Sequence, residues 1–101
     1  MIFVAGQLNI DTAVQDAFLA DVAAMRPKVL KEAGCYHYSL LAELNEPGVI
    51  NVLEQWEDDD ALKVHFTMPW IIEFAQKYAP NMKGATVKVY DIDGGRDLPP
   101  M

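Results

Sequence analysis

Two ionisable side chains lie in a stretch of aromatic and apolar residues, where they could act on an aromatic ligand. His65 is the better general base, because the intrinsic pKa of histidine lies close to neutrality. Glu54 is the alternative, because it shares a predicted strand face with Trp56 and burial there would raise its pKa. A base beside an aromatic ring could hold a phenol and remove its proton. The structural alternatives are that His65 is an ordinary core histidine and that Glu54 hydrogen-bonds to Trp56 or to the neighbouring helix.

Further aromatic and amide side chains could complete such a site. The aromatic residues that could form its walls are Trp56, Tyr38, Phe66, Trp70, Phe74 and Tyr78. Trp56 and Tyr38 are the better candidates, because each carries a polar group that must find a partner when buried. Asn9 and Gln7 could hydrogen-bond to a substrate or to oxygen. The alternative is that the rings belong to the core and that the two amides satisfy groups at a strand edge.

The elements that must position these side chains are a strand over residues 49–57 and a helix over residues 58–66. The strand is rich in β-branched residues, and alternation places Glu54 and Trp56 on the same face. Both of its faces carry apolar residues, so both need a cover, and we expect a second subunit to supply one of them. Asp58 is suited to cap the helix, with acidic residues at its positive end. A metal site at this acidic run is the alternative, but no second cluster of ligands is evident.

The whole chain predicts a ferredoxin-like α+β fold, βαββαβ, with an antiparallel sheet that pairs with a second copy as a dimeric α+β barrel. The long helix is predicted to open with a capping box at Thr12 and Gln15, to kink at Pro27 and to end at Gly34. A second helix begins near Thr67 and Pro69. We expect one domain over residues 1–93 and a tail over residues 94–101. The predicted strands cover residues 2–10, 35–44, 49–57 and 85–92.

Composition excludes several classes of partner. The net charge of -7 argues against binding to nucleic acid or to an anionic membrane. Cys35 is the sole cysteine, which excludes an internal disulfide and a cysteine-based zinc site. The N-terminus lacks the basic region of a signal peptide, and no apolar run approaches the roughly 20 residues that span a bilayer. We therefore expect a cytoplasmic protein without a metal site.

The sequence resembles the antibiotic biosynthesis monooxygenase family over residues 2–92, and its bacterial quinol monooxygenase branch most of all. The residues that carry the resemblance are Gly34-Cys35, Tyr38, Glu54-x-Trp56, Ala61-Leu62, His65 and Pro69. The resemblance implies a homodimer that oxidises hydroxylated aromatics with molecular oxygen and uses no flavin, haem or metal. A related haem-degrading branch uses an Asn, Trp and His set. This chain has Asn9, but it carries His65 where that branch carries Trp, and Gln76 and Tyr78 where a haem-ligating His is expected.

The resulting prediction is a cofactor-independent monooxygenase that acts on a quinol or a polyhydroxylated aromatic, with His65 or Glu54 as the base. The alternative is a non-catalytic dimeric barrel that binds a small aromatic ligand in a stress or structural role. A base that points into a cavity favours the enzyme, and a cavity filled by side chains favours the alternative.

Overall fold

An antiparallel sheet of five strands forms one layer of the protein, and the computed structural model describes residues 1–101. The strands are β1 (Ile2–Ile10), β2 (Cys35–Ala42), β3 (Val49–Trp56), β4 (Met82–Ala85) and β5 (Lys88–Asp91). The strand order is β2-β3-β1-β4, and β5 pairs with β1 beside β4. Every pairing is antiparallel. β1 and β3 are therefore the central strands, and they carry most of the buried side chains of the sheet.

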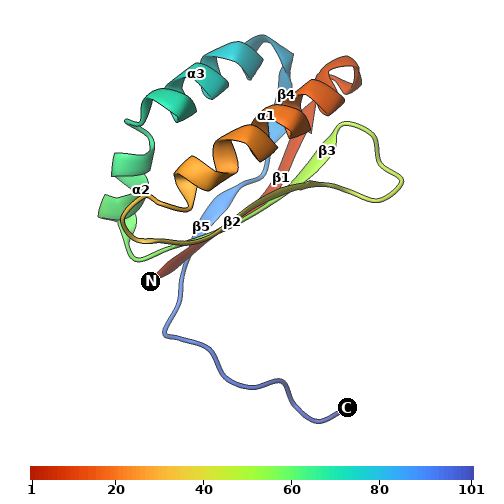
Figure 1. The fold of residues 1–101 in the computed structure, drawn as a ribbon. Coiled ribbons are helices and arrows are strands. Elements are labelled where there is room, and N and C mark those ends of the chain that lie inside the picture. The colour runs from red at the N-terminus through yellow and green to blue at the C-terminus, as the bar shows by residue number, and fades with distance from the viewer.

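Three helices form the second layer, and all of them lie on one face of the sheet (Figure 1). They are α1 (Gln15–Val29), α2 (Asp59–His65) and α3 (Pro69–Tyr78), with 3-10 turns at Thr12–Val14 and Ala79–Asn81. The strand order, the antiparallel pairing and the single helical layer confirm the predicted ferredoxin-like α+β fold. No helix is both long enough and apolar enough to cross a membrane.

The core lies between the sheet and the helices, where the predicted alternation is confirmed. Ile2, Val4 and Ile10 of β1 are buried, and so are Ile50 and Trp56 of β3. The helices contribute an apolar stripe to the same core, made of Phe18, Val22, Met25, Val29 and Leu62. The residues of odd number on β1 and β3 project to the other face of the sheet, which no element of this chain covers (Figure 1).

The boundaries of α1 differ from the prediction at both ends. Asp11 accepts a hydrogen bond from the backbone N–H of Ala13 and opens a 3-10 turn, so α1 begins only at Gln15. The Gln15 side chain accepts a hydrogen bond from Gly48 instead of closing a capping box. At the other end α1 stops at Val29, and Gly34 adopts its positive φ of 79° in the loop that follows. That loop also carries Glu32 into the interior.

The predicted last strand is two short strands, β4 and β5, which both pair with β1. The interruption at Thr86 faces Gly6 of β1, which has a φ of 148°. A Cβ atom at Gly6 would lie 2.5 Å from the Thr86 backbone oxygen, so only glycine allows this close approach. The predicted second strand is also shorter, because it ends at Ala42, and a bulge between Cys35 and His37 removes Tyr36 from the inward-facing row. Tyr36 is 55% exposed as a result.

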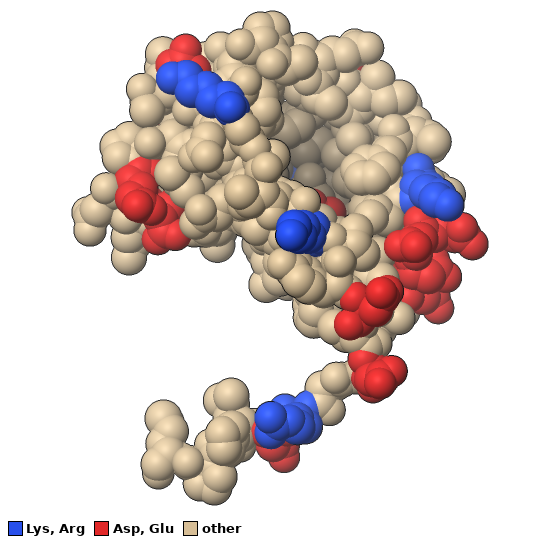
Figure 2. All heavy atoms as spheres, turned by 180° about the vertical axis from the view of Figure 1, so that it is seen from behind, with Lys and Arg blue, Asp and Glu red and all other residues tan.

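Charge on the surface is divided among several acidic groups and isolated basic side chains. Figure 2 shows two such acidic groups at opposite sides of the body, and the centre of this face is hollowed between large uncharged areas. The C-terminal segment after β5 extends away from the body (Figure 1).

Asp58 caps α2 as predicted, since its carboxylate accepts a hydrogen bond from the backbone N–H of Ala61.

Candidate functional site

The predicted base and its aromatic neighbours do meet, at the corner where β3 ends and α2 lies against the sheet. β3 brings Glu54 and Trp56 to its helix-facing side, and Tyr38 lies opposite Glu54 on β2. The helix α2 then places His65 over these strands, with its ring centroid 4.6 Å from that of Trp56 and 5.6 Å from that of Tyr38. His65 is only 2% exposed. The sequence pattern therefore located the four residues that share this interior corner.

Glu32 is the main partner of His65. Its two carboxylate oxygens lie 2.9 and 3.0 Å from Nδ1 of His65. The indole N–H of Trp70, in the first turns of α3, donates to the same carboxylate at 2.9 Å. A carboxylate accepts hydrogen bonds, so Nδ1 of the neutral imidazole carries the hydrogen. Glu32 thus fixes the tautomer of His65 and holds α1, α2 and α3 together at one point.

The remaining ring nitrogen of His65, Nε2, has no hydrogen-bond partner in the protein. Every fully buried side-chain nitrogen or oxygen does have a partner, so Nε2 keeps a small contact with solvent although the residue is almost completely buried. Burial lowers the pKa of His65, and this effect outweighs the opposing hydrogen bond and negative charge of Glu32. The imidazole is therefore neutral near pH 7 and presents a free lone pair, as a general base requires.

Glu54 is the second buried acid of this corner. Its Oε1 accepts a hydrogen bond from the indole N–H of Trp56 at 2.9 Å, which is the structural alternative considered for this residue. Burial raises the pKa of Glu54, the hydrogen bond from Trp56 opposes this effect, and the nearby charge of Glu32 adds to it, so that the resulting pKa is about 7. Glu54 is consequently close to half ionised at neutral pH and could also exchange a proton there.

Two weaker acids border the cluster. Burial raises the pKa of the Tyr38 phenol above its ordinary value, with the charges of Glu54 and Glu32 adding to the effect. The same three causes, burial first, raise the pKa of the Cys35 thiol to about 11. Both groups stay protonated at neutral pH, so Tyr38 can donate a hydrogen bond and Cys35 is a poor nucleophile.

The other predicted site residues lie farther from His65. Phe66 follows it directly, with ring centroids 5.7 Å apart, but Phe66 is 59% exposed. Phe74 and Tyr78 of α3 pack against Phe18 of α1 instead. The largest departure concerns the amides, because Asn9 and Gln7 project to the uncovered face of the sheet. There the Gln7 amide donates to Asn51, apart from the His65 cluster.

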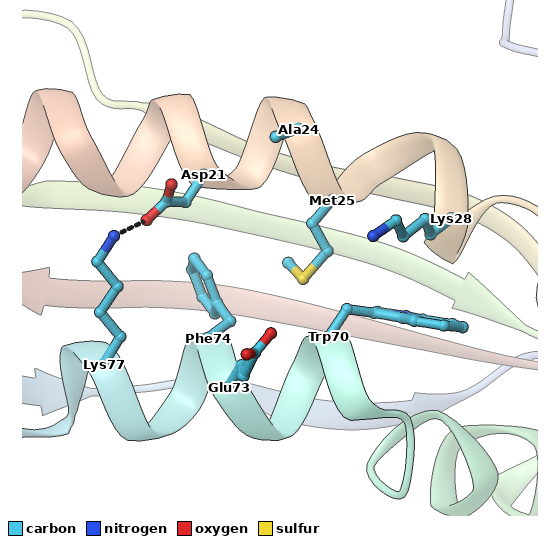
Figure 3. A pocket seen from close by; sticks show the side chains of 8 residues that line it. All are labelled: Asp21, Ala24, Met25, Lys28, Trp70, Glu73, Phe74 and Lys77. Carbon is cyan, nitrogen blue, oxygen red and sulfur yellow. Dashed lines mark hydrogen bonds and ion pairs between the residues drawn. The ribbon is translucent and has the colours of Figure 1, made fainter.

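A groove of about 470 Å³ lies between α1 and α3 (Figure 3). Its lining consists of Asp21, Ala24, Met25, Lys28, Trp70, Glu73, Phe74 and Lys77. Trp70 joins the groove to the buried cluster, since its ring lines the groove while its N–H binds Glu32. His65 and Glu54 do not line this groove, nor a second hollow of similar size between α1 and β2.

The sequence pattern did not point to Glu32. It follows α1 in a run of charged residues, Lys31-Glu32, which is typical of an exposed turn. A usable signal is nevertheless present in the chemistry of His65, because a buried imidazole needs an acceptor for its Nδ1–H. The few acidic residues near the ends of the predicted helices would then have been the candidates.

Comparison with known proteins identifies the family. A family model described as antibiotic biosynthesis monooxygenase matches residues 1–77. An uncharacterized protein from Synechocystis sp. is 30% identical over 93 residues, which cover 90% of this chain and 63% of that protein. A crystal structure from Caulobacter crescentus that carries the same family name is 28% identical, with a TM-score of 0.82 over 92% of this chain and 90% of that chain. One from Deinococcus radiodurans has a TM-score of 0.86 over 99% and 100% of the two chains, but its 16% identity supports the fold alone. The chain belongs to the antibiotic biosynthesis monooxygenase family.

Proposed function

We propose that this protein is a cofactor-independent monooxygenase that oxidises a quinol or a polyhydroxylated aromatic with molecular oxygen. The observation that carries the proposal is the neutral His65 held through Nδ1 by Glu32, with Nε2 free and aromatic rings on several sides. Such a base can remove a phenolic proton, and the resulting anion passes an electron to oxygen far more readily than the phenol does. The family membership and the acidic, aromatic-rich interior are consistent with this chemistry.

The overall reaction balances without an external reductant. A dihydroxyarene with a free ring C–H and one O₂ give a hydroxylated quinone and one water. One oxygen atom forms the new C–O bond, and the O–O bond breaks so that the other atom leaves as water. The aromatic substrate supplies all four electrons: two through ring hydroxylation and two through oxidation of the quinol to the quinone. In this scheme His65 takes the phenolic proton on Nε2, and Glu32 stabilises the imidazolium that forms.

A non-catalytic role is the second candidate, and one observation favours it. Neither hollow on the protein is lined by His65 or Glu54, so a ligand bound in the α1–α3 groove would contact Trp70 and not the base. On this alternative the protein binds a small aromatic molecule without turnover, and the His65–Glu32 bond serves only to hold the helices together.

Oxygen consumption separates the two candidates. Metal-stripped protein is mixed with reduced naphthoquinols and dihydroxyarenes, and their autoxidation is subtracted. We expect uptake that is lost in His65→Gln and kept in His37→Gln, because His37 bonds to Ser39 on β2 and is absent from the cluster. Incorporation of ¹⁸O from ¹⁸O₂ into the product distinguishes oxygenation from simple oxidation that releases peroxide. Tight binding without uptake would instead support the non-catalytic role.

We also propose that two copies of the chain pack through the uncovered face of the sheet. That face exposes apolar side chains, among them Leu41 at 64% and Leu53 at 42%. The hydrogen bonds from Gln7 to Asn51 and from Asn51 to Glu43 order its polar side chains and leave the apolar ones free for contact. In such a homodimer the second copy covers the face of the sheet that the helices leave open, as the apolar residues on both faces of β3 require.

A further inference from the structure

The groove between α1 and α3 has the form of a small-molecule site. Its volume of about 470 Å³ falls within the range of roughly 300 to 1,000 Å³ that is usual for ligand pockets. Apolar side chains of Met25, Phe74 and Trp70 line its length (Figure 3). One end is closed by the ion pair between Lys77 and Asp21, whose atoms lie 2.7 Å apart. At the other end the ring of Trp70 forms the wall.

Two of the four charges in the groove have no partner in the protein. The structure contains only two ion pairs, His65–Glu32 and Lys77–Asp21, so Lys28 and Glu73 remain free. Lys28 extends over Trp70, with Nζ 5.9 Å from the ring centroid. Figure 3 shows the Glu73 carboxylate directed into the middle of the groove. A ligand would therefore meet an apolar surface, a cation at the Trp70 end and a hydrogen-bond acceptor near the centre.

We propose that this groove binds a hydroxylated aromatic carboxylate, with its carboxylate on Lys28, its ring against Trp70 and Phe74, and its hydroxyl donating to Glu73. The protein carries a net charge of -7 and repels anions in general, so the free Lys28 beside an aromatic wall must supply the attraction locally. Glu73 favours a hydroxyl over a second anionic group at the centre. The substrate class is thus narrowed from quinols in general to those that carry a single acidic group.

The claim that the ligand of this groove is the substrate rests on the proposed function. The structural link is Trp70, because a ring stacked on it is separated from Glu32 by one side chain and from His65 by two, Trp70 and Glu32.

Redox-inert probes test the site without oxygen. The probes are 6-hydroxy-2-naphthoate, 2-naphthol, which lacks the carboxylate, and 2-naphthoate, which lacks the hydroxyl. Isothermal titration calorimetry on the whole chain is expected to give a Kd for the hydroxynaphthoate about 3- to 10-fold below that for 2-naphthol. Lys28→Met keeps the apolar stem and should abolish this difference. Lys83→Met, on exposed β4, is the matched control and should preserve it.

The position of the ligand is tested by NMR of the two indole N–H groups. Titration of the hydroxynaphthoate should shift the Trp70 resonance, which Trp70→Phe identifies, and leave that of buried Trp56 in place. Equal affinity for hydroxynaphthoate and 2-naphthol, no effect of Lys28→Met, an unmoved Trp70 resonance or no binding of any probe would each overturn the inference. Specific binding without oxygen uptake would remove the proposed function and leave the site intact. Oxygen uptake with neutral quinols that Lys28→Met does not change would support the proposed function and overturn the groove as the site of an acidic substrate.

Discussion

The buried carboxyl of Glu54 should make the stability of this protein fall as the pH rises. Its pKa is about 7 in the folded protein, against an ordinary value of 4.5. Each pKa unit corresponds to about 1.4 kcal/mol, so ionising Glu54 costs about 3 kcal/mol more in the folded protein than in the unfolded chain. Because the folded pKa is the higher one, the stabilising contribution is fully present below about pH 4.5 and is lost as the pH rises through about 7.

Glu54→Gln isolates this effect, because glutamine is neutral at every pH and its carbonyl oxygen can still accept the bond from Trp56. Urea titrations at pH 4.5, 6 and 8 give the free energy of unfolding of both proteins. We expect the variant to differ from the wild type by less than about 0.5 kcal/mol at pH 4.5 and to be more stable by about 3 kcal/mol at pH 8. Glu46→Gln, in the exposed turn before β3, is the control and should show no such trend.

The reasoning is refuted if the advantage of Glu54→Gln does not grow between pH 4.5 and pH 8. A variant that is less stable than the wild type at every pH would show that the Glu54 carboxylate is better solvated than its buried position on β3 indicates. A trend of the same size in Glu46→Gln would assign the pH dependence to the overall negative charge of the protein.

Three further changes test other parts of the structure. Gly6→Ala should lower the free energy of unfolding by about 1 to 3 kcal/mol, measured by urea titration, because its Cβ would clash with the Thr86 backbone; an unchanged stability would contradict the close approach. Glu32→Gln removes the charge that raises the pKa of His65, so that pKa should fall further in an NMR titration of the imidazole; an unchanged pKa would show that the His65–Glu32 pair is not formed. Leu53→Glu should convert a dimer into a monomer in light scattering after gel filtration, and a wild-type monomer would contradict the proposed packing.

The alternation within β1 and β3 made the fold predictable, because the helix-facing side of both strands carries mainly apolar residues. The ends of elements were less predictable, since they depend on contacts from distant parts of the chain. The break between β4 and β5 exists because the backbone of Thr86 passes close to Gly6. Likewise Gly34 has the left-handed backbone expected of a helix cap, but it lies in the loop after α1. Its backbone carbonyl accepts a hydrogen bond from the backbone N–H of Glu57. Only the folded structure brings these partners together.

The aromatic residues, His65 and Glu54 of this corner were predictable from the sequence, and Glu32 was not. Trp56, Tyr38 and His65 could be found because strand and helix periodicity place them on inward faces. Glu32 lies in an irregular loop, where no periodicity reports burial, and its sequence neighbours are charged. The groove between α1 and α3 also depends on how two helices meet, which side-chain spacing on either helix alone does not reveal.

Glu32 explains how an imidazole in an apolar interior could still act as a base. Burial alone lowers the pKa of His65, which keeps the ring neutral but also makes it a weak acceptor of protons. The Glu32 carboxylate, 2.9 Å from Nδ1, opposes this loss because it stabilises the imidazolium that forms when Nε2 takes a proton. Under the proposed function, the two effects together leave His65 unprotonated at rest and able to hold a proton taken from the substrate. A histidine with only the burial, or only the carboxylate, would lack one of these two properties.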